Sequence, residues 1–160
     1  MELDTFTDLL DYPMYLVTAE AADERAGCLV GFASQCSIHP PRYTVWLSKA
    51  NHTYRVARHA SHLGVHLLRR DDRSLAELFG SETGDSVDKF ARVAWEPGHG
   101  GTPVLGEACA WFVGRVLDRF EGGDHVGFLL EPVAESPQVP GRPRLLRFTD
   151  VKSLTPGHPA

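Results

Sequence analysis

The stretch "GCLVGFASQCSIHPPRYTVWLSKANHTY", residues 27–54, decides the fold. Two runs rich in aliphatic, β-branched and aromatic residues, Gly27–Ser34 and Arg42–Ser48, predict strands, and the double proline between them predicts a turn. Asn51 can cap a helix that begins directly after the second strand. The stretch therefore predicts a strand-turn-strand-helix unit with small polar residues where each strand ends.

The segments on either side of this unit extend the same pattern. Met14–Ala19 predicts a strand and "EAADERA" after it predicts a turn, so the chain starts with three antiparallel strands in succession. Beyond the helix, Gly64–Leu68 predicts a short strand. Asp71–Gly80 then predicts a short amphipathic helix, because a capping residue precedes apolar residues at helical spacing and a glycine ends the run.

The second half of the chain predicts two long strands. They are "EACAWFVGRVLDRF" (107–120) and "HVGFLLEPVAE" (125–135), joined by the glycine-rich hairpin signal "EGGD". The glycines and prolines of Trp95–Leu105 predict an irregular connection across the surface, and the polar Ser81–Phe90 predicts a loop or a turn of helix. "PRLLRF" (143–148) predicts a last strand.

In this order the elements predict a mainly β fold, a Greek-key split β-barrel of six or seven strands with two or three short helices. The strands mostly follow one another and do not alternate with helices as in a doubly wound sheet. A length of 160 residues with 42% hydrophobic content suits one domain. We therefore expect a single domain over residues 1–160, with its core at about 10–150 and a flexible C-terminal tail, "TPGHPA".

The composition argues against several classes of protein. The formal net charge is -5 without a long run of one sign, so we expect neither nucleic acid nor a membrane surface as a partner. No stretch reaches the roughly 18 apolar residues of a membrane helix, and the N-terminus is acidic where a signal peptide would be basic. We therefore expect a cytoplasmic protein. The three cysteines form no C-x-x-C pair, which argues against a disulfide framework or a zinc ribbon.

Motifs for several kinds of chemistry are missing from the sequence. The glycine motif of a dinucleotide fold, the P-loop, the nucleophile elbow G-x-S-x-G and the zinc motif H-E-x-x-H do not occur. His59, His62 and His66 have the spacing of a metal site on one helix face, but the predicted helix ends near Ser61 and separates them. We expect no metal site, and we assign large aromatic residues such as Trp46 to the barrel core.

Two clusters of small polar residues mark the strand ends of the opening stretch. The first cluster is Ser34, Gln35, Cys36 and Ser37, and the second is Ser48, Lys49, Asn51 and Thr53. Backbone amides leave the sheet after the first cluster, and the first N–H groups of a helix, which favour an anion, follow the second. Both clusters suit a heterocycle with a phosphate tail. The alternative is that their side chains only cap local backbone.

The motifs of the chain, taken together, resemble the flavin reductase-like family of the FMN-binding split barrel. "GCLVGFASQCSIHPP" is similar to the family's "G-M-T-A-N-S-F-T-S-V-S-L-D-P-P" in its glycine start, serine placement and double proline. "SKANHTY" after the next strand, "DKF" at Asp88–Phe90 and "GGDHVGFLLEPV" from Gly122 are further similarities. The resemblance spans residues 10 to about 136.

The resemblance implies a homodimer that binds FMN, or FAD, near its interface and reduces it with NADH or NADPH, with a monooxygenase as a partner that receives the reduced flavin. The first polar cluster would then face the isoalloxazine edge and the second would hold the phosphate, with Lys49 as the charge. Phe90 would approach the cofactor, and His125 would act near the nicotinamide or the flavin ring. Such hydride transfer is cofactor chemistry and needs no protein nucleophile.

The sequence departs from the family at Leu29, Gly31 and Phe32, where polar side chains are common. This departure favours a second hypothesis, a flavin-binding carrier or sensor without turnover. A third hypothesis is a split barrel that binds another cofactor, a deazaflavin or haem.

Overall fold

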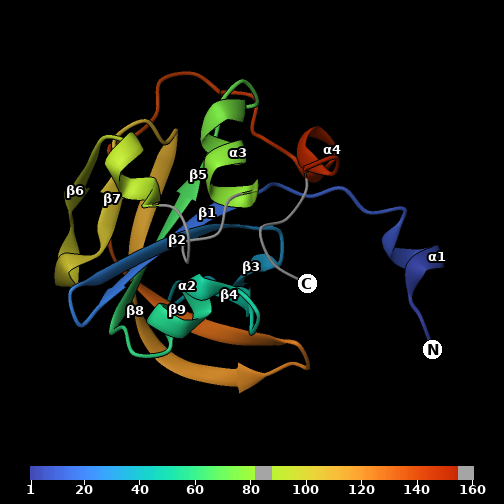
Figure 1. The fold of residues 1–160 in the computed structure, drawn as a ribbon, viewed down its shortest axis with the longest axis horizontal. Helices are drawn as coiled ribbons and strands as arrows, with labels where there is room; N and C mark the ends of the chain where they lie inside the picture. The colour runs from blue at the N-terminus through green and yellow to red at the C-terminus, as the bar shows by residue number, and fades with distance from the viewer. Residues whose placement is uncertain (82–87, 155–160) are drawn as a thin grey trace.

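The computed structural model describes residues 1–81 and 88–154. Within these residues, seven antiparallel strands form one curved sheet in the order β2-β1-β5-β8-β9-β4-β3 (Figure 1). The strands are β1 (Tyr15–Ala21), β2 (Glu24–Val30), β3 (Ala33–Ser37), β4 (Arg42–Ser48), β5 (His62–Leu67), β8 (Ala110–Glu121) and β9 (His125–Glu135). The predicted mainly β split barrel is confirmed.

Short elements decorate this sheet. They are α1 (Asp4–Thr7), α2 (His52–Ala57), α3 (Arg73–Ser81), α4 (Phe148–Val151), the 3-10 helices η1 (Lys89–Arg92) and η2 (His99–Gly101), and the paired strands β6 (Trp95–Pro97) and β7 (Pro103–Leu105). Figure 1 shows α3 on one side of the sheet and α1 held away from it. No residue of α1 is buried, so the core starts after it.

The strand predicted over Gly27–Ser34 is two strands that pair with different neighbours. β2 pairs with β1, whereas β3 pairs with β4. The break falls at Gly31, where a Cβ atom would lie 2.5 Å from the Tyr12 ring, so a side chain does not fit there. The next carbonyl, that of Phe32, accepts a hydrogen bond from the Trp46 N–H at 2.9 Å and starts the pairing with β4.

Three further predictions are corrected. The turn after β1 is only Ala22 and Asp23, both at positive φ (53° and 63°), because two such residues match the twist of a tight hairpin. Trp95–Leu105 contains the strands β6 and β7 rather than only irregular chain. Residues 143–148 form isolated bridges at Leu145 and Arg147 and not a strand. The predicted tail, 155–160, and most of the predicted loop, 82–87, lie outside the described residues.

The barrel interior is closed at one end by α2. Val56 and Ala57 of this helix are 3% and 0% exposed and pack with inward side chains of the strands, among them Ala19, Val126 and Phe128. The helix is short, with one capped start, so its position depends on this packing more than on its own propensity. Because the helix follows β4 after only a few residues, it holds the C-terminal end of β4 at this end of the barrel.

A second hydrophobic cluster covers the outer side of β1, β2 and β5, and we call the elements that form it the covering layer: α3, η1, β6, β7 and the segment around Leu146. Its buried members include Leu16, Phe79, Phe90 and Leu146. The alternation of the strands requires this layer, since residues such as Leu16 point away from the interior and would otherwise be exposed.

Candidate functional site

The outer side of β3, β4 and β9 carries polar residues, and we call it the β4 face. Val45 and Leu47 point into the interior, so their neighbours along β4 point outward. Cross-strand pairs extend this outward row from Ser34, opposite Thr44, to His125, opposite Ser48. The β4 face consists of Ser34, Cys36, Thr44, Trp46, Ser48 and His125.

Trp46 forms the middle of the β4 face, and its assignment to the barrel core is wrong. Its indole lies against the backbone of the β8–β9 hairpin, where a Cβ atom at Gly122 or Gly127 would come within 2.6 or 2.8 Å of the ring. These glycines leave the room that the ring occupies. The sequence did contain a signal for this outward position. Alternate residues of a strand point to the same side, so Trp46 shares a side with Ser48 and not with Val45.

The structure divides the first predicted cluster between two sides of the sheet. Ser34 and Cys36 belong to the β4 face, where the Thr44 hydroxyl donates to Cys36 Sγ at 3.3 Å. Gln35 is opposite Tyr43, whose ring packs against the interior cluster, so the two belong to the other side of the sheet. Ser37 follows an irregularity in the pairing and lies near the far end of β4.

Ser48 and Lys49 of the second cluster lie at the hairpin end of the β4 face. The Ser48 hydroxyl oxygen accepts a hydrogen bond from the Ala50 N–H at 3.2 Å. Lys49 Nζ is paired with Glu121 at 2.7 Å, and this carboxylate raises the pKa of the amine. Thr44, opposite Ser34, is four residues from Ser48, so the two clusters are separated by about 13 Å along the strand.

Asn51 and Thr53 are turned toward the protein. Asn51 Oδ1 accepts the Thr53 N–H at 2.8 Å, which caps α2 as predicted, and Thr53 is only 1% exposed. Both side chains are hydrogen-bonded to the buried Cys28 thiol. Burial raises the pKa of that thiol to about 11, although hydrogen bonds from Thr53 and Asn51 and the charge of Lys89 act in the opposite direction. Their structural role, capping and packing, is therefore clear.

His125 is oriented by its neighbour Asp124 and by an aromatic contact. Its Nδ1 lies 2.7 Å from the Asp124 carboxylate, and this hydrogen bond lowers the pKa of Asp124. The Phe32 ring, which is 53% exposed, lies with its centroid 5.0 Å from that of the His125 ring. Phe32, one of the departures from the family pattern, thus borders the β4 face directly.

Phe90 lies in the covering layer and not on the β4 face. It is 6% exposed and packs edge-on against Phe79 and Trp95 at centroid distances of 5.5 and 5.9 Å. The neighbouring Lys89 is buried and donates to the carbonyls of Gly27 and Phe79 at 3.3 and 3.2 Å. The "DKF" segment therefore ties α3 to β2 within the covering layer.

The histidines are dispersed in the structure. His59 is exposed just after α2, whereas His66 is buried in β5 and bonded to the Leu16 carbonyl. His62 lies beside His99, with ring centroids 5.3 Å apart. In residues 1–81 and 88–154, no three histidine, cysteine or acidic side chains are arranged to hold a metal ion, and no helix there has the length and hydropathy of a membrane span.

The β4 face fits the two kinds of group that a flavin nucleotide presents. Hydroxyls at Ser34 and Thr44 suit the polar edge of a flat ring, and the Trp46 indole supplies an aromatic surface beside them. At the other end, the Ser48 hydroxyl can donate to a phosphate, and the Lys49 ammonium keeps further N–H donors for it beside its pair with Glu121. The fit depends on side chains of β3, β4 and β9 and of the turn after β4, not on the start of α2.

Most of the chain matches a known protein family. Residues 7–148 match the family described as "Flavin reductase like domain". A probable flavin reductase of Rhizobium meliloti (strain 1021) is 30% identical over 114 residues, which are 69% of this chain and 36% of the relative. The reductase component of a 4-nitrophenol 4-monooxygenase/4-nitrocatechol 2-monooxygenase from Rhodococcus opacus is 34% identical over 128 residues, 80% of this chain and 66% of the relative.

The chain is shorter than the curated relatives it resembles, since it spans 36% of the Rhizobium reductase and 48% of a stachydrine N-demethylase reductase subunit of the same organism. Solved structures share the fold. An FMN-binding protein from Thermus thermophilus has a TM-score of 0.81 at 24% identity and covers 91% of this chain and 85% of its own. A flavin reductase domain protein from Arthrobacter sp. FB24 has a TM-score of 0.79 at 21% identity, and the match covers 98% of this chain and 94% of the Arthrobacter chain. This chain belongs to the flavin reductase-like family.

Proposed function

We propose that this protein is an NAD(P)H-dependent flavin reductase that binds FMN along the β4 face. The observation that carries the proposal is the continuous row from Ser34 to His125, which lies inside the residues that match the family. It offers ring contacts at one end and a phosphate contact at the other. We place the phosphate on Ser48 and Lys49, because Asn51 and Thr53 face Cys28.

Bound flavin supplies the redox chemistry, since its ring can take up a hydride from a reduced nicotinamide. The residues of the chain bind and orient the two rings. Ser34 and Thr44 hold the polar edge of the flavin, and Trp46 lies flat on the hairpin and gives the ring a fixed surface. Cys36 accepts the Thr44 hydroxyl and so orients it.

His125 is the polar residue best placed to assist the transfer. Asp124 accepts a hydrogen bond from Nδ1–H of the imidazole, which leaves Nε2 as the atom that can bond a ligand. The ring belongs to the β4 face through its pairing with Ser48. His125 therefore holds a hydrogen-bonding atom at the hairpin end of that face, and we propose that this atom contacts the nicotinamide or the flavin.

The finer features of the proposal are supported by relatives. The Thermus protein, which covers most of this chain, is an FMN-binding protein, and an NADH:FAD oxidoreductase from Streptomyces globisporus shares the fold with a TM-score of 0.74. These names support FMN, with FAD as the alternative, and NADH as one donor. The Rhodococcus relative supports a monooxygenase as the acceptor of reduced flavin. The homodimer and the cytoplasmic location stay predictions.

A second candidate function is favoured by Phe32. Its ring lies against the His125 ring, on the residue that would assist the transfer. A site in which Phe32 keeps the nicotinamide from His125 would bind flavin without turnover, as a carrier or sensor does.

Two measurements on the purified protein test the proposal. Oxidation of NADH and of NADPH is followed with FMN and with FAD, and we expect a rate well above that without protein. Saturable FMN binding with background oxidation would instead support the carrier. A spectrum of the protein as isolated that shows deazaflavin or haem would overturn both.

The phosphate site is tested with the double variant Ser48→Ala/Lys49→Gln. Charge-assisted hydrogen bonds are worth about 1.5–3 kcal/mol each, so FMN affinity should fall roughly tenfold or more. Riboflavin, which has no phosphate, should bind both proteins equally. The exposed Lys152→Gln is the control with the same charge change. Unchanged FMN affinity in the double variant would place the phosphate elsewhere.

A further inference from the structure

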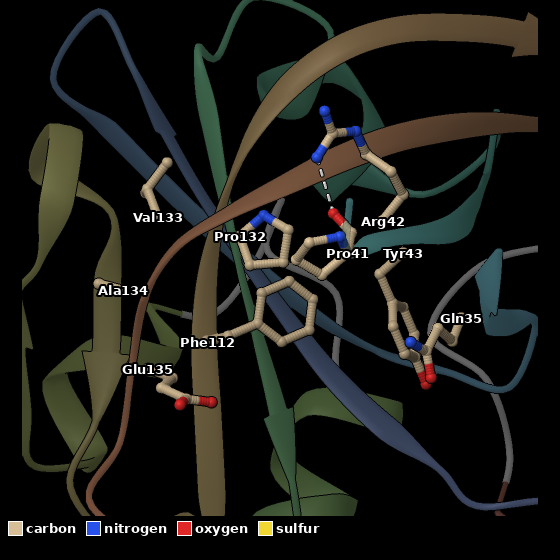
Figure 2. A pocket seen from close by; sticks show the side chains of 9 residues that line it. All are labelled: Gln35, Pro41, Arg42, Tyr43, Phe112, Pro132, Val133, Ala134 and Glu135. Atoms are coloured by element: carbon tan, nitrogen blue, oxygen red, sulfur yellow. Dashed lines mark hydrogen bonds between the residues drawn. The ribbon is translucent and has the colours of Figure 1, made fainter. Parts of the chain in front are cut away.

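A hollow of about 530 Å³ lies at the barrel end where Tyr15 and Tyr43 close the interior (Figure 2). Its lining comes from β3, the turn before β4, β4 itself, the start of β8 and the end of β9. The lining residues are Gln35, Pro41, Arg42, Tyr43, Phe112, Pro132, Val133, Ala134 and Glu135. The hollow is separate from the β4 face because Gln35 and Tyr43 point to the opposite side of the sheet from their neighbours Ser34 and Thr44.

The walls of the hollow suit a flat ring. The rings of Tyr43 and Phe112 have centroids 5.5 Å apart, and Figure 2 shows Phe112 in the middle of the hollow with Pro41 and Pro132 beside it. The Tyr43 hydroxyl is bonded to that of Tyr15, which fixes its ring. Aromatic and proline surfaces of this kind bind planar apolar groups, and barrel mouths are common places for such sites.

Among the polar groups at the hollow, the one with an unbalanced charge is an acceptor, the Glu135 carboxylate. Arg42 is already bonded to the Pro41 carbonyl at 2.8 Å and to Glu131 at 3.4 Å. The Gln35 amide nitrogen donates one N–H to the Ser37 carbonyl, and its amide oxygen can accept a further bond. Among the described residues, the Glu135 carboxylate has no ion-pair partner, and Figure 2 shows it beside Phe112, on the side away from Gln35. A ligand should therefore bring hydrogen-bond donors.

We propose that this hollow is a second ligand site, for a small aromatic molecule that carries a hydrogen-bond donor, such as a phenolic hydroxyl or an aromatic amine. The ring lies against Phe112 and Tyr43, and the donor reaches Glu135 or the Gln35 oxygen. An aromatic carboxylate is disfavoured beside Glu135, because it has no donor there and meets a like charge. The site does not depend on the proposed reductase function.

The test is a titration of the isotope-labelled protein with phenol and with aniline, followed by amide NMR shifts. A ligand of this size should bind with a dissociation constant on the order of 1 mM. We expect shifts around Phe112, Ala134 and Glu135, and much weaker shifts with benzoate and with cyclohexanol. Shifts that instead map to Trp46 and His125, or equal responses to phenol and cyclohexanol, would overturn the proposal.

Two variants and a competition between phenol and FMN test where the ligand binds. Val133→Trp fills the rim, so phenol binding should weaken roughly tenfold or more, whereas Phe120→Trp, at another exposed apolar position, should have no effect. Glu135→Gln should weaken aniline binding severalfold and leave the fold intact. This variant tests the site even if Val133→Trp does not fold. Phenol should still bind when FMN is saturating. Displacement by FMN, or a dimer that blocks the hollow at every concentration, would refute a separate site.

Discussion

The barrel interior and the covering layer are built from different contacts. The interior is filled by side chains that point inward at every second strand residue, such as Val45, Leu47 and Phe128. The covering layer joins irregular segments to the sheet through bonds between side chains and backbone. Thr18 donates to the Pro103 carbonyl at 2.6 Å and so fixes β7 to β1. Beyond its own hydrophobic cluster, the covering layer is therefore held by specific polar contacts to the sheet.

The two parts should respond differently to substitutions. A truncated side chain in the interior leaves a cavity, whereas a changed polar side chain that attaches the covering layer leaves buried backbone groups without partners. His66 and Lys89, both buried, make such bonds in the covering layer. The free energy of unfolding should accordingly respond to volume in the interior and to hydrogen bonding and pH in the covering layer.

The largest effect is expected for Phe128→Ala. Phe128 is fully buried in the interior and contacts Tyr54 of α2, so its removal should lower the free energy of unfolding by about 3–5 kcal/mol. Denaturation by urea measures this change. Phe120→Ala, at a position 40% exposed on β8, should have a small effect. Equal losses in both variants would mean that the interior does not dominate stability.

The second prediction concerns pH and His66. Nδ1–H of this ring donates to the Leu16 carbonyl at 2.9 Å and Nε2 accepts the Leu105 N–H at 3.1 Å, so the neutral ring satisfies both partners. Burial lowers the pKa of His66 from 6.5 to about 4. Below pH 6.5 the unfolded chain binds a proton that the folded chain does not. Stability should therefore be unaffected above this pH and fall by up to about 3 kcal/mol as the pH drops toward 4.

The control for this pH dependence is His66→Gln. The amide can also donate and accept hydrogen bonds but does not titrate, so the loss between pH 6.5 and 4 should be smaller in this variant. Urea denaturation at several pH values gives both curves. Parallel curves for the two proteins would show that other groups cause the acid sensitivity.

Much of the interior could be predicted from the sequence, because inward-pointing apolar residues recur at every second position of its strands. The predicted strand Arg42–Ser48 has the bounds of β4, and the long pair β8 and β9 was predicted with its glycine turn. In the covering layer, the strands β6 and β7 were not predicted. Strands of three residues have too few positions to show a period, and their attachment depends on His66, which is far away in the sequence.

The sequence indicated only some of the residues of the β4 face. The sequence indicated the polar residues of β3 and β4, but only pairing shows that Ser34 shares a face with Ser48 while Gln35 lies on the other side. Thr53 was assigned to a ligand because the first N–H groups of a helix favour an anion and because the family resemblance implied a phosphate there. Its contact with Cys28 comes from another strand, so local sequence could not reveal it.

The third prediction is Lys89→Met in the covering layer. The carbonyls of Gly27 and Phe79 would lose a charged donor while they stay buried, and the expected loss of stability is about 2–3 kcal/mol. Lys152→Met, an exposed lysine, is the matched control. A loss in Lys89→Met as small as in the control would contradict the view that bonds to backbone hold the covering layer.

The smallest effect is expected for Asn51→Ala, which removes a bond between side chain and backbone at the closed end of the interior. Loss of the cap of α2 should cost about 1 kcal/mol, less than in the covering layer, because water can reach the partly exposed start of this helix and replace the bond. Asn51→Ser keeps a capping oxygen and should recover most of the loss in thermal denaturation. If serine and alanine destabilise equally, the hydrogen bond of Asn51 to Cys28, and not the cap, is what matters at this position, and the interior then also depends on a specific polar contact.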